Sequence, residues 1–161
     1  MLSEKFEENE IFFLMSETNL QDLYQSILIK HSKSPSHYGK FEGFTHFSEG
    51  YNALCGDAIS IYLSVKEGII EKAYFESASC AICKASASIL LEAIEGTSKE
   101  TFPSVQNGFS EILEGNPGGQ SEALNADILA FQGIKEFPSR KNCALLPYTT
   151  FQKALNSEIK D

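Results

Sequence analysis

A run of alternating apolar and polar residues constrains the fold of this chain more than any other feature. Every second residue from Ile59 to Val65 is aliphatic, and the residues between them are Ser or Tyr. This alternation predicts a strand with one buried face. Lys66-Glu67-Gly68 then predicts a turn, and Ile69 to Glu76 predicts a second strand. The chain should therefore contain a β-hairpin within a small antiparallel sheet.

Helical signals lie on both sides of this hairpin. Asn19 can cap a helix that runs from Leu20 to about Ser34, where Pro35 stops it. Ser79 can cap a second helix over Cys80–Glu95. A short strand is expected within Ser36–Ala53, and further helices over Phe109–Leu113, Glu122–Phe131 and Ala144–Ser157. Pro147 is tolerated only in a first helical turn, which predicts that the last helix begins no earlier than about Cys143.

The charge balance excludes several classes of partner. The 161 residues include 13 Lys and Arg against 22 Asp and Glu, a net charge of -9, and no segment concentrates the basic residues. Such a chain repels phosphate backbones and anionic membranes, so we expect neither nucleic acid nor a membrane as partner. The length favours one domain with a sizeable core.

The first residues and the cysteine count suggest a location. The apolar run Ile11–Met15 follows acidic residues and is far shorter than the ~20 residues of a membrane span, so we expect neither a signal peptide nor an anchor. Residues 1–14 are interpreted as an N-terminal extension or a mis-assigned start, and residues 15–161 as a single domain. Four cysteines are too few for a disulfide scaffold, which favours a reduced, cytoplasmic setting.

Three cysteines lie at predicted element ends, where side chains can converge. Cys55 precedes a strand, Cys80 lies between a strand and a helix, and Cys143 falls at a predicted helix N-terminus, which would lower its thiol pKa. Asp57 is two residues from Cys55, so an extended chain points both to one side. Three thiolates and a carboxylate form a suitable tetrahedral set for zinc, with a net charge of −2 that Arg140 and Lys141 can offset.

Simpler interpretations of these residues remain open. Cys80-Ala81-Ile82-Cys83 matches the C-x-x-C of redox proteins, but the chain has no second such pair. We expect Cys83 to be a core residue or a bystander. The histidines His31, His37 and His46 have no ligand spacing and are expected to be caps, surface residues or core hydrogen-bonding groups.

Four ordered motifs together resemble the SufU/IscU/NifU N-terminal family of iron-sulfur cluster assembly proteins. They cover most of the chain between Leu20 and Leu155: Leu23-Tyr24-x-x-Ile27-x-x-x-His31-x-x-x-Pro35, Asn52-Ala53-Leu54-Cys55-Gly56-Asp57, Cys80-x-x-x-x-Ala85-Ser86-Ala87-Ser88 and Phe137-Pro138-Ser139-Arg140-x-x-Cys143. The resemblance implies an α+β fold with an antiparallel, about three-stranded sheet packed with helices. It also implies that Cys55, Asp57, Cys80 and Cys143 are the ligands of a metal or cluster.

Two features are similar to the SufU branch of the family. The stretch between Cys80 and Cys143 is long, and no His precedes Cys143. The leading hypothesis is a zinc-bound sulfur acceptor in which Cys55 takes persulfide sulfur from a SufS-like cysteine desulfurase, with Arg140 as a supporting charge. Downstream cluster assembly proteins would be further partners. Such a protein is at most a sulfurtransferase-like carrier rather than a turnover enzyme.

Alternatives predict different chemistry from the same residues. An IscU-type scaffold would assemble a [2Fe-2S] cluster on Cys55, Asp57, Cys80 and Cys143. A thiol-disulfide oxidoreductase would use Cys80 and Cys83, and a structural zinc domain would carry no sulfur chemistry. Cys83 could also replace Cys80 as a ligand, or pair with it on oxidation.

Overall fold

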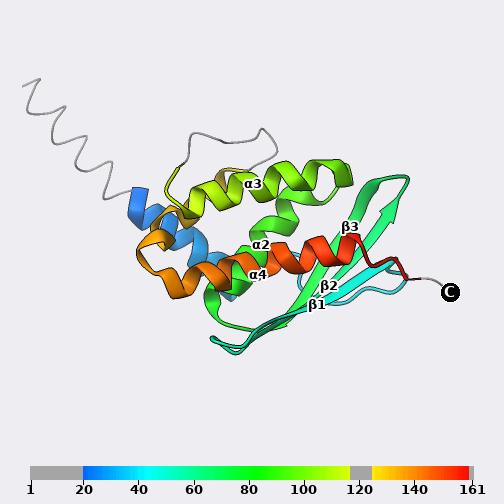
Figure 1. Cartoon of the computed structure of the whole chain (residues 1–161), viewed down its shortest axis with the longest axis horizontal. Helices are drawn as coiled ribbons and strands as arrows, with labels where there is room; N and C mark the ends of the chain where they lie inside the picture. Colours follow the sequence, from blue (N-terminus) through cyan, green and yellow to red (C-terminus); the bar gives the residue numbers. More distant parts are fainter. Residues whose placement is uncertain (1–19, 117–124, 160–161) are drawn as a thin grey trace, which may run out of the picture.

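The computed structural model describes residues 20–116 and 125–159 (Figure 1). A first helix over residues 20–33 precedes three strands, β1 (His46–Asn52), β2 (Asp57–Lys66) and β3 (Ile69–Ala78). The helices that follow are α2 (Ala81–Ile94), η1 (Lys99–Thr101), α3 (Phe102–Leu113), η3 (Ala126–Glu136) and α4 (Pro138–Leu155). The α+β class with a three-stranded antiparallel sheet is confirmed. None of the helices in these described ranges is both long and apolar enough to cross a membrane.

The sheet has the order β1-β2-β3 and is antiparallel throughout. Glu67 and Gly68 form the predicted turn between β2 and β3, and both have positive φ angles, of 52° and 79°. Two-residue hairpin turns need this conformation because it matches the twist of the strands. At the opposite end of the sheet, residues 53–56 connect β1 to β2 after the pair Asn52↔Asp57.

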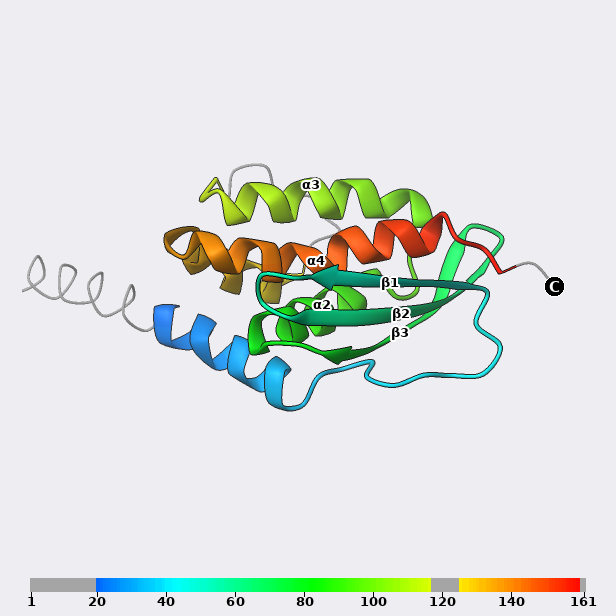
Figure 2. The same ribbon diagram turned by 60° about the horizontal axis from the view of Figure 1, so that its bottom comes forward.

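The helices pack on one face of the sheet (Figure 2). The alternating aliphatic residues of β2 point into this layer, and Ile59, Ile61 and Leu63 are buried there with most of α2. Helix α4 lies very close to β1 at Gly50, where an added Cβ would clash with the side chain of Thr150. Glycine is therefore required at this position by the close approach of helix and strand.

The other face of the sheet carries an aromatic cluster toward the β2–β3 turn. Tyr62 is buried there because Phe44 and Phe47 pack against its ring, with ring centroids 5.1 and 5.2 Å away. Phe41 continues the cluster to Tyr74, at 5.5 Å. Residues 37–47 thus cover one part of this face.

Several predicted boundaries differ from the structure. The third helix is much longer than expected, and the segment predicted as a helix to Phe131 is a 3-10 helix, η3, from Ala126 to Glu136. The first residues of that predicted helix, the predicted cap Asn19 and the predicted boundary at residue 14 lie outside the described residues. Cys80, not Ser79, is the N-cap of α2.

The prediction for the last helix is wrong. Helix α4 begins at Pro138 and contains Pro147 in its interior. Pro138 occupies the first turn, where a missing N–H costs nothing. At Pro147 the missing donor leaves the Cys143 carbonyl without its helical partner, a cost that packing of α4 against β1, β2 and α2 must offset.

Candidate metal centre

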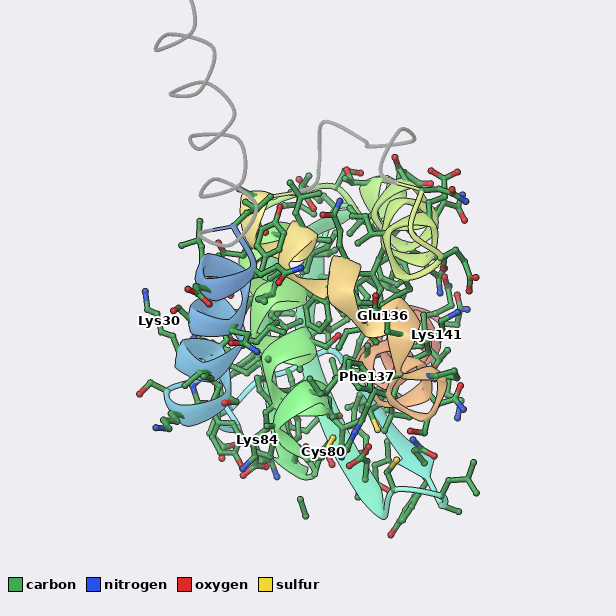
Figure 3. The ribbon with its side chains drawn as sticks, turned by 90° about the vertical axis from the view of Figure 1, so that its left-hand side faces the viewer. Lys30, Cys80, Lys84, Glu136, Phe137 and Lys141 are labelled. Atoms are coloured by element: carbon green, nitrogen blue, oxygen red, sulfur yellow. The ribbon has the colours of Figure 1, made fainter. Side chains whose placement is uncertain are left out.

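The structure brings the four predicted site residues to one end of the molecule, where Figure 3 labels Cys80 and Phe137. Cys55 lies in the loop of residues 53–56, and Asp57 is the first residue of β2. Cys80 caps α2, and Cys143 lies in the second turn of α4. Four separate elements therefore contribute one side chain each.

Three of these side chains form a compact set of donors. The sulfur of Cys143 lies 3.0 Å from the sulfur of Cys55, and a carboxylate oxygen of Asp57 lies within 4.8 Å of both. Cys80 completes the group less closely, with its sulfur 3.8 Å from Asp57 Oδ2. All four cysteines are free thiols.

The donor chemistry fits a zinc ion. A tetrahedral zinc with bonds of about 2.3 Å separates two thiolate sulfurs by roughly 3.8 Å. The 3.0 Å between Cys55 and Cys143 is shorter, so the pair needs to open slightly to accept an ion between them. Three sulfurs and one carboxylate oxygen would then complete four-coordination.

Asp57 is fully buried and is positioned by the start of α2. The Cys80 N–H donates to Asp57 Oδ1 over 2.8 Å, which satisfies one oxygen of the carboxylate and links β2 to α2. The other oxygen, Oδ2, faces the Cys80 sulfur. A buried carboxylate is costly unless it is paired, and this arrangement leaves Oδ2 able to bind a cation.

The local electrostatics differ from the prediction at Cys143. Because α4 begins at Pro138, Cys143 is not at the helix N-terminus, and its thiol is buried. Burial raises the pKa of Cys143, and hydrogen bonding with Cys55, Asp57 and Cys80 raises it further. A metal ion would reverse this effect, since a coordinated thiol is deprotonated.

The two basic residues before Cys143 have separate roles. Charge at Cys80 and then hydrogen bonding with Cys143 raise the pKa of the exposed Arg140 guanidinium, so this cation lies near the thiols. Lys141 instead pairs with Glu114, at 3.0 Å between Nζ and Oε1. Of the two predicted compensating charges, only Arg140 faces the site.

Several neighbours of the site were missed by the sequence interpretation. The Ser139 carbonyl lies 4.0 and 3.9 Å from the sulfurs of Cys55 and Cys143, and nothing in the sequence signals a backbone group. Asn52 Nδ2 points to the Cys143 sulfur at 3.7 Å. Asn52 is the first residue of the motif that contains Cys55 and Asp57, and this position was the signal that could have identified it as a neighbour of the site.

Cys83 and the histidines are not part of this donor set. Cys83 is fully buried in the core, and burial raises its pKa to about 12, so it is a poor nucleophile. The histidines have hydrogen-bonding partners, as predicted: Asp127 and Ser88 for His31, the Ala73 carbonyl for His37, and Thr45 for His46. His37 Nδ1 also lies 3.1 Å from Glu95 Oε2.

Comparison with known proteins identifies the family. The family described as NifU-like N terminal domain matches residues 23–144. The chain belongs to this family. FiSufU from the thermophile Fervidobacterium islandicum AW-1 has the same fold, with a TM-score of 0.73 and 29% identity over 80% of this chain and 93% of FiSufU.

Curated relatives from this family carry two different descriptions. The zinc-dependent sulfurtransferase SufU of Bacillus subtilis is 34% identical over 87% of this chain and 94% of its own length. The iron-sulfur cluster assembly scaffold protein IscU of Streptococcus pyogenes serotype M1 is also 34% identical, over 88% of this chain and 87% of its own length. Overall identity therefore does not separate the two descriptions.

Proposed function

We propose that this protein is an iron-sulfur cluster assembly component that holds zinc and accepts sulfur from a cysteine desulfurase. The observation that carries the proposal is the gathering of two thiols and a buried carboxylate within 4.8 Å of one another. The similarity to a relative named as a zinc-dependent sulfurtransferase supports it. A cytoplasmic location and a single functional domain over residues 15–161 are part of the same proposal.

The residues that would hold zinc are Cys55, Asp57, Cys80 and Cys143. Bound zinc keeps thiols deprotonated at neutral pH, which is the chemistry it supplies here. Cys143 depends most on this effect because burial otherwise favours its protonated form. Asp57 would supply the single oxygen donor, which is a chemically harder ligand than the three sulfurs.

Cys55 is the residue proposed to accept sulfur. Its thiolate attacks the terminal sulfur of a persulfide on the desulfurase, so a new S–S bond forms on Cys55. The S–S bond of the desulfurase breaks, and the desulfurase cysteine leaves as a thiolate, with no net oxidation or reduction. Cys55 is half-buried in a loop, whereas Cys80 and Cys143 belong to helices, so Cys55 can move with the least disruption.

Charge and exposed apolar surface favour docking at this end. Arg140 is positioned to attract the persulfide anion and to offset the negative charge of the thiolates. Tyr51, Leu54 and Phe137 are 78%, 88% and 58% exposed and flank the site. Large exposed apolar side chains are typical of a surface that a protein partner covers.

Metal and acid-labile sulfide content of protein purified without oxygen tests the zinc assignment. We expect about one zinc per chain and no labile sulfide. Iron with matching sulfide would contradict the assignment and favour a scaffold.

Replacement of the proposed acceptor tests the sulfur chemistry. We expect Cys55→Ser to abolish transfer of labelled sulfur from a cysteine desulfurase, detected as a persulfide by mass spectrometry. Cys83→Ala is the matched control, because Cys83 lies in the core, and it should accept sulfur normally. Normal transfer to Cys55→Ser would disprove the role of Cys55.

An IscU-type scaffold is the second candidate. The same donors can bind iron, since thiolates are the ordinary ligands of a [2Fe-2S] cluster, and a relative named as a scaffold is equally similar. Anaerobic reconstitution that yields a transferable cluster with the visible absorption of iron-sulfur proteins would favour this function.

A further inference from the structure

The uncovered part of the outer sheet face contains a hollow of about 370 Å³. It lies on the opposite side of the sheet from the helices, next to the cysteine end. Small residues form its floor: Ala58, Ser60 and Ala78 adjoin one another on β2 and β3. Tyr51 stands beside Ala58 at the end nearest the cysteine loop. Large aromatic side chains cover the sheet farther along, so the small residues leave this part open.

Two glutamates lie on either side of the floor. Ser60 pairs with Glu49 on β1 and with Glu76 on β3, so all three side chains form one row across the sheet. Neither glutamate takes part in an ion pair with any residue that the structure describes. Glu76 keeps its place through Tyr62, whose hydroxyl donates to Glu76 Oε1 over 2.8 Å.

The two glutamates also influence Tyr62, which lies beside this row. Burial raises the pKa of Tyr62 to about 12, and the hydrogen bond and charge of Glu76 and the charge of Glu49 act in the same direction. Both carboxylates therefore act on the same small region of the outer face.

The edge of the hollow along β3 is also defined. The Tyr38 hydroxyl donates to the Ser77 carbonyl at 3.2 Å and lies 3.3 Å from the Ser77 nitrogen. The hollow thus has aromatic side chains at its rim, carboxylates on two sides and an uncharged floor. This combination suits a flat cation that can stack on a ring while donating to carboxylates.

We infer that the hollow binds an arginine side chain presented by a protein that docks over the cysteine end of this molecule. Guanidinium groups donate to two acceptors at once and stack on aromatic rings, whereas an ammonium group offers only a point charge. Because Ala58 follows Asp57 directly and Ala78 is two residues before Cys80, a protein that fills the hollow lies next to the candidate metal centre. Acidic nucleic acid and anionic lipid are disfavoured by the same carboxylates.

The test uses the zinc-loaded full chain and two short capped peptides, which differ only in carrying arginine or citrulline at one position. Citrulline has nearly the same shape but no charge. We expect the arginine peptide to shift the backbone amide signals of Glu49, Ser60, Glu76 and Ala78 in ¹⁵N NMR spectra, with an affinity in the millimolar range. The citrulline peptide should bind at least about tenfold more weakly.

The variant Glu49→Gln/Glu76→Gln should lower the affinity for the arginine peptide by about tenfold, since glutamine keeps an acceptor for Tyr62 but removes the charge. Glu100→Gln/Glu111→Gln is the matched control, because it changes the net charge equally at exposed positions on η1 and α3. Four outcomes would each overturn the inference. Two of them are equal binding of the two peptides, and a loss of affinity in the control variant as large as that in the double glutamate variant. The other two are amide shifts confined to other residues, and no amide shifts up to about 10 mM peptide.

Discussion

The two loops at opposite ends of the sheet are attached to the fold in different ways. The turn of Glu67 and Gly68 is held by backbone hydrogen bonds, since Lys99 N donates to Gly68 O over 2.8 Å and Ile70 N donates to Thr97 O over 2.9 Å. The loop of residues 53–56 is attached through a side chain: the Cys55 sulfur lies 3.0 Å from the Cys143 sulfur. One loop completes the fold, and the other carries the Cys55 thiol at the candidate metal centre.

This difference has a thermodynamic consequence. Backbone hydrogen bonds stabilise the β2–β3 turn under all conditions in which the protein folds. The position of the cysteine loop, residues 53–56, depends on the contacts that the Cys55 sulfur makes with the rest of the site. We therefore expect a metal ion to order the cysteine loop and to leave the other turn unchanged.

The largest expected effect is on zinc affinity. Cys55→Ala should lower the affinity at least about 100-fold, because it removes one of the four proposed ligands, while it changes the unfolding free energy of the metal-free protein by less than about 0.5 kcal/mol. Competition with a chelating dye measures the first quantity and urea unfolding the second. Glu67→Ala is the control and should leave zinc affinity unchanged. A large loss of metal-free stability in Cys55→Ala would show that this loop supports the fold after all.

Hydrogen exchange should show the next largest effect. Adding zinc to the metal-free protein should slow exchange of the amides of residues 54–56 by about tenfold or more, because the ion restrains the loop. The amides of Ile70 and Lys99 are already hydrogen-bonded, so their exchange should not change. Equal protection of both loops upon adding zinc would mean that the two ends are coupled.

The pH dependence of stability should also differ between the two metal states. Burial raises the pKa of Cys83 to about 12 and raises that of Cys143 above its ordinary value. Their neutral forms therefore stabilise the metal-free fold fully below about pH 8.5, and this contribution is lost as the pH rises toward the folded pKa, by up to about 1.4 kcal/mol per pH unit for each thiol.

When zinc is bound, Cys143 should no longer contribute to the fall of stability with pH, because a coordinated thiol carries no proton to lose. Urea unfolding between about pH 8 and 10.5 should thus show a shallower decline with zinc than without it. Cys83→Ala should remove most of the decline that remains with zinc. Identical declines with and without zinc would contradict ligation by Cys143.

The smallest effect concerns the glycines of the two loops. Gly56 and Gly68 have φ angles of 69° and 79°, and an added Cβ would meet no atom within 4 Å at either position, so alanine tests backbone strain alone. Gly68→Ala should lower the unfolding free energy by about 1 kcal/mol, because its backbone is held. Gly56→Ala should cost less in the metal-free protein, where the loop can adjust, but should reduce zinc affinity severalfold. Equal stability losses would remove the distinction between the loops.

Local patterns predicted much of this fold. The alternation from Ile59 to Val65 and the Lys66-Glu67-Gly68 turn predicted the hairpin, because a two-residue period and a left-handed turn are properties of adjacent residues. The predicted start of α4 is wrong because the preference of proline for the first helical turn was applied to Pro147. Pro138 meets the same preference and is the proline that starts the helix. Packing of α4 against the sheet decides which proline starts the helix, and packing depends on distant residues.

The candidate site shows the same division. Residue type and order led to the prediction of Cys55, Asp57, Cys80 and Cys143 as the ligand set, and the structure brings these four residues to one end of the molecule. The raised pKa of Cys143 and the approach of the Ser139 carbonyl arise only when α4 lies beside the cysteine loop. The pairing of Lys141 with Glu114 likewise needs α4 to lie beside the end of α3. The order of residues alone fixes which donors the protein has and how they are spaced along the chain. The tertiary structure decided their distances, burial and charge, because these depend on contacts between elements that are far apart along the chain.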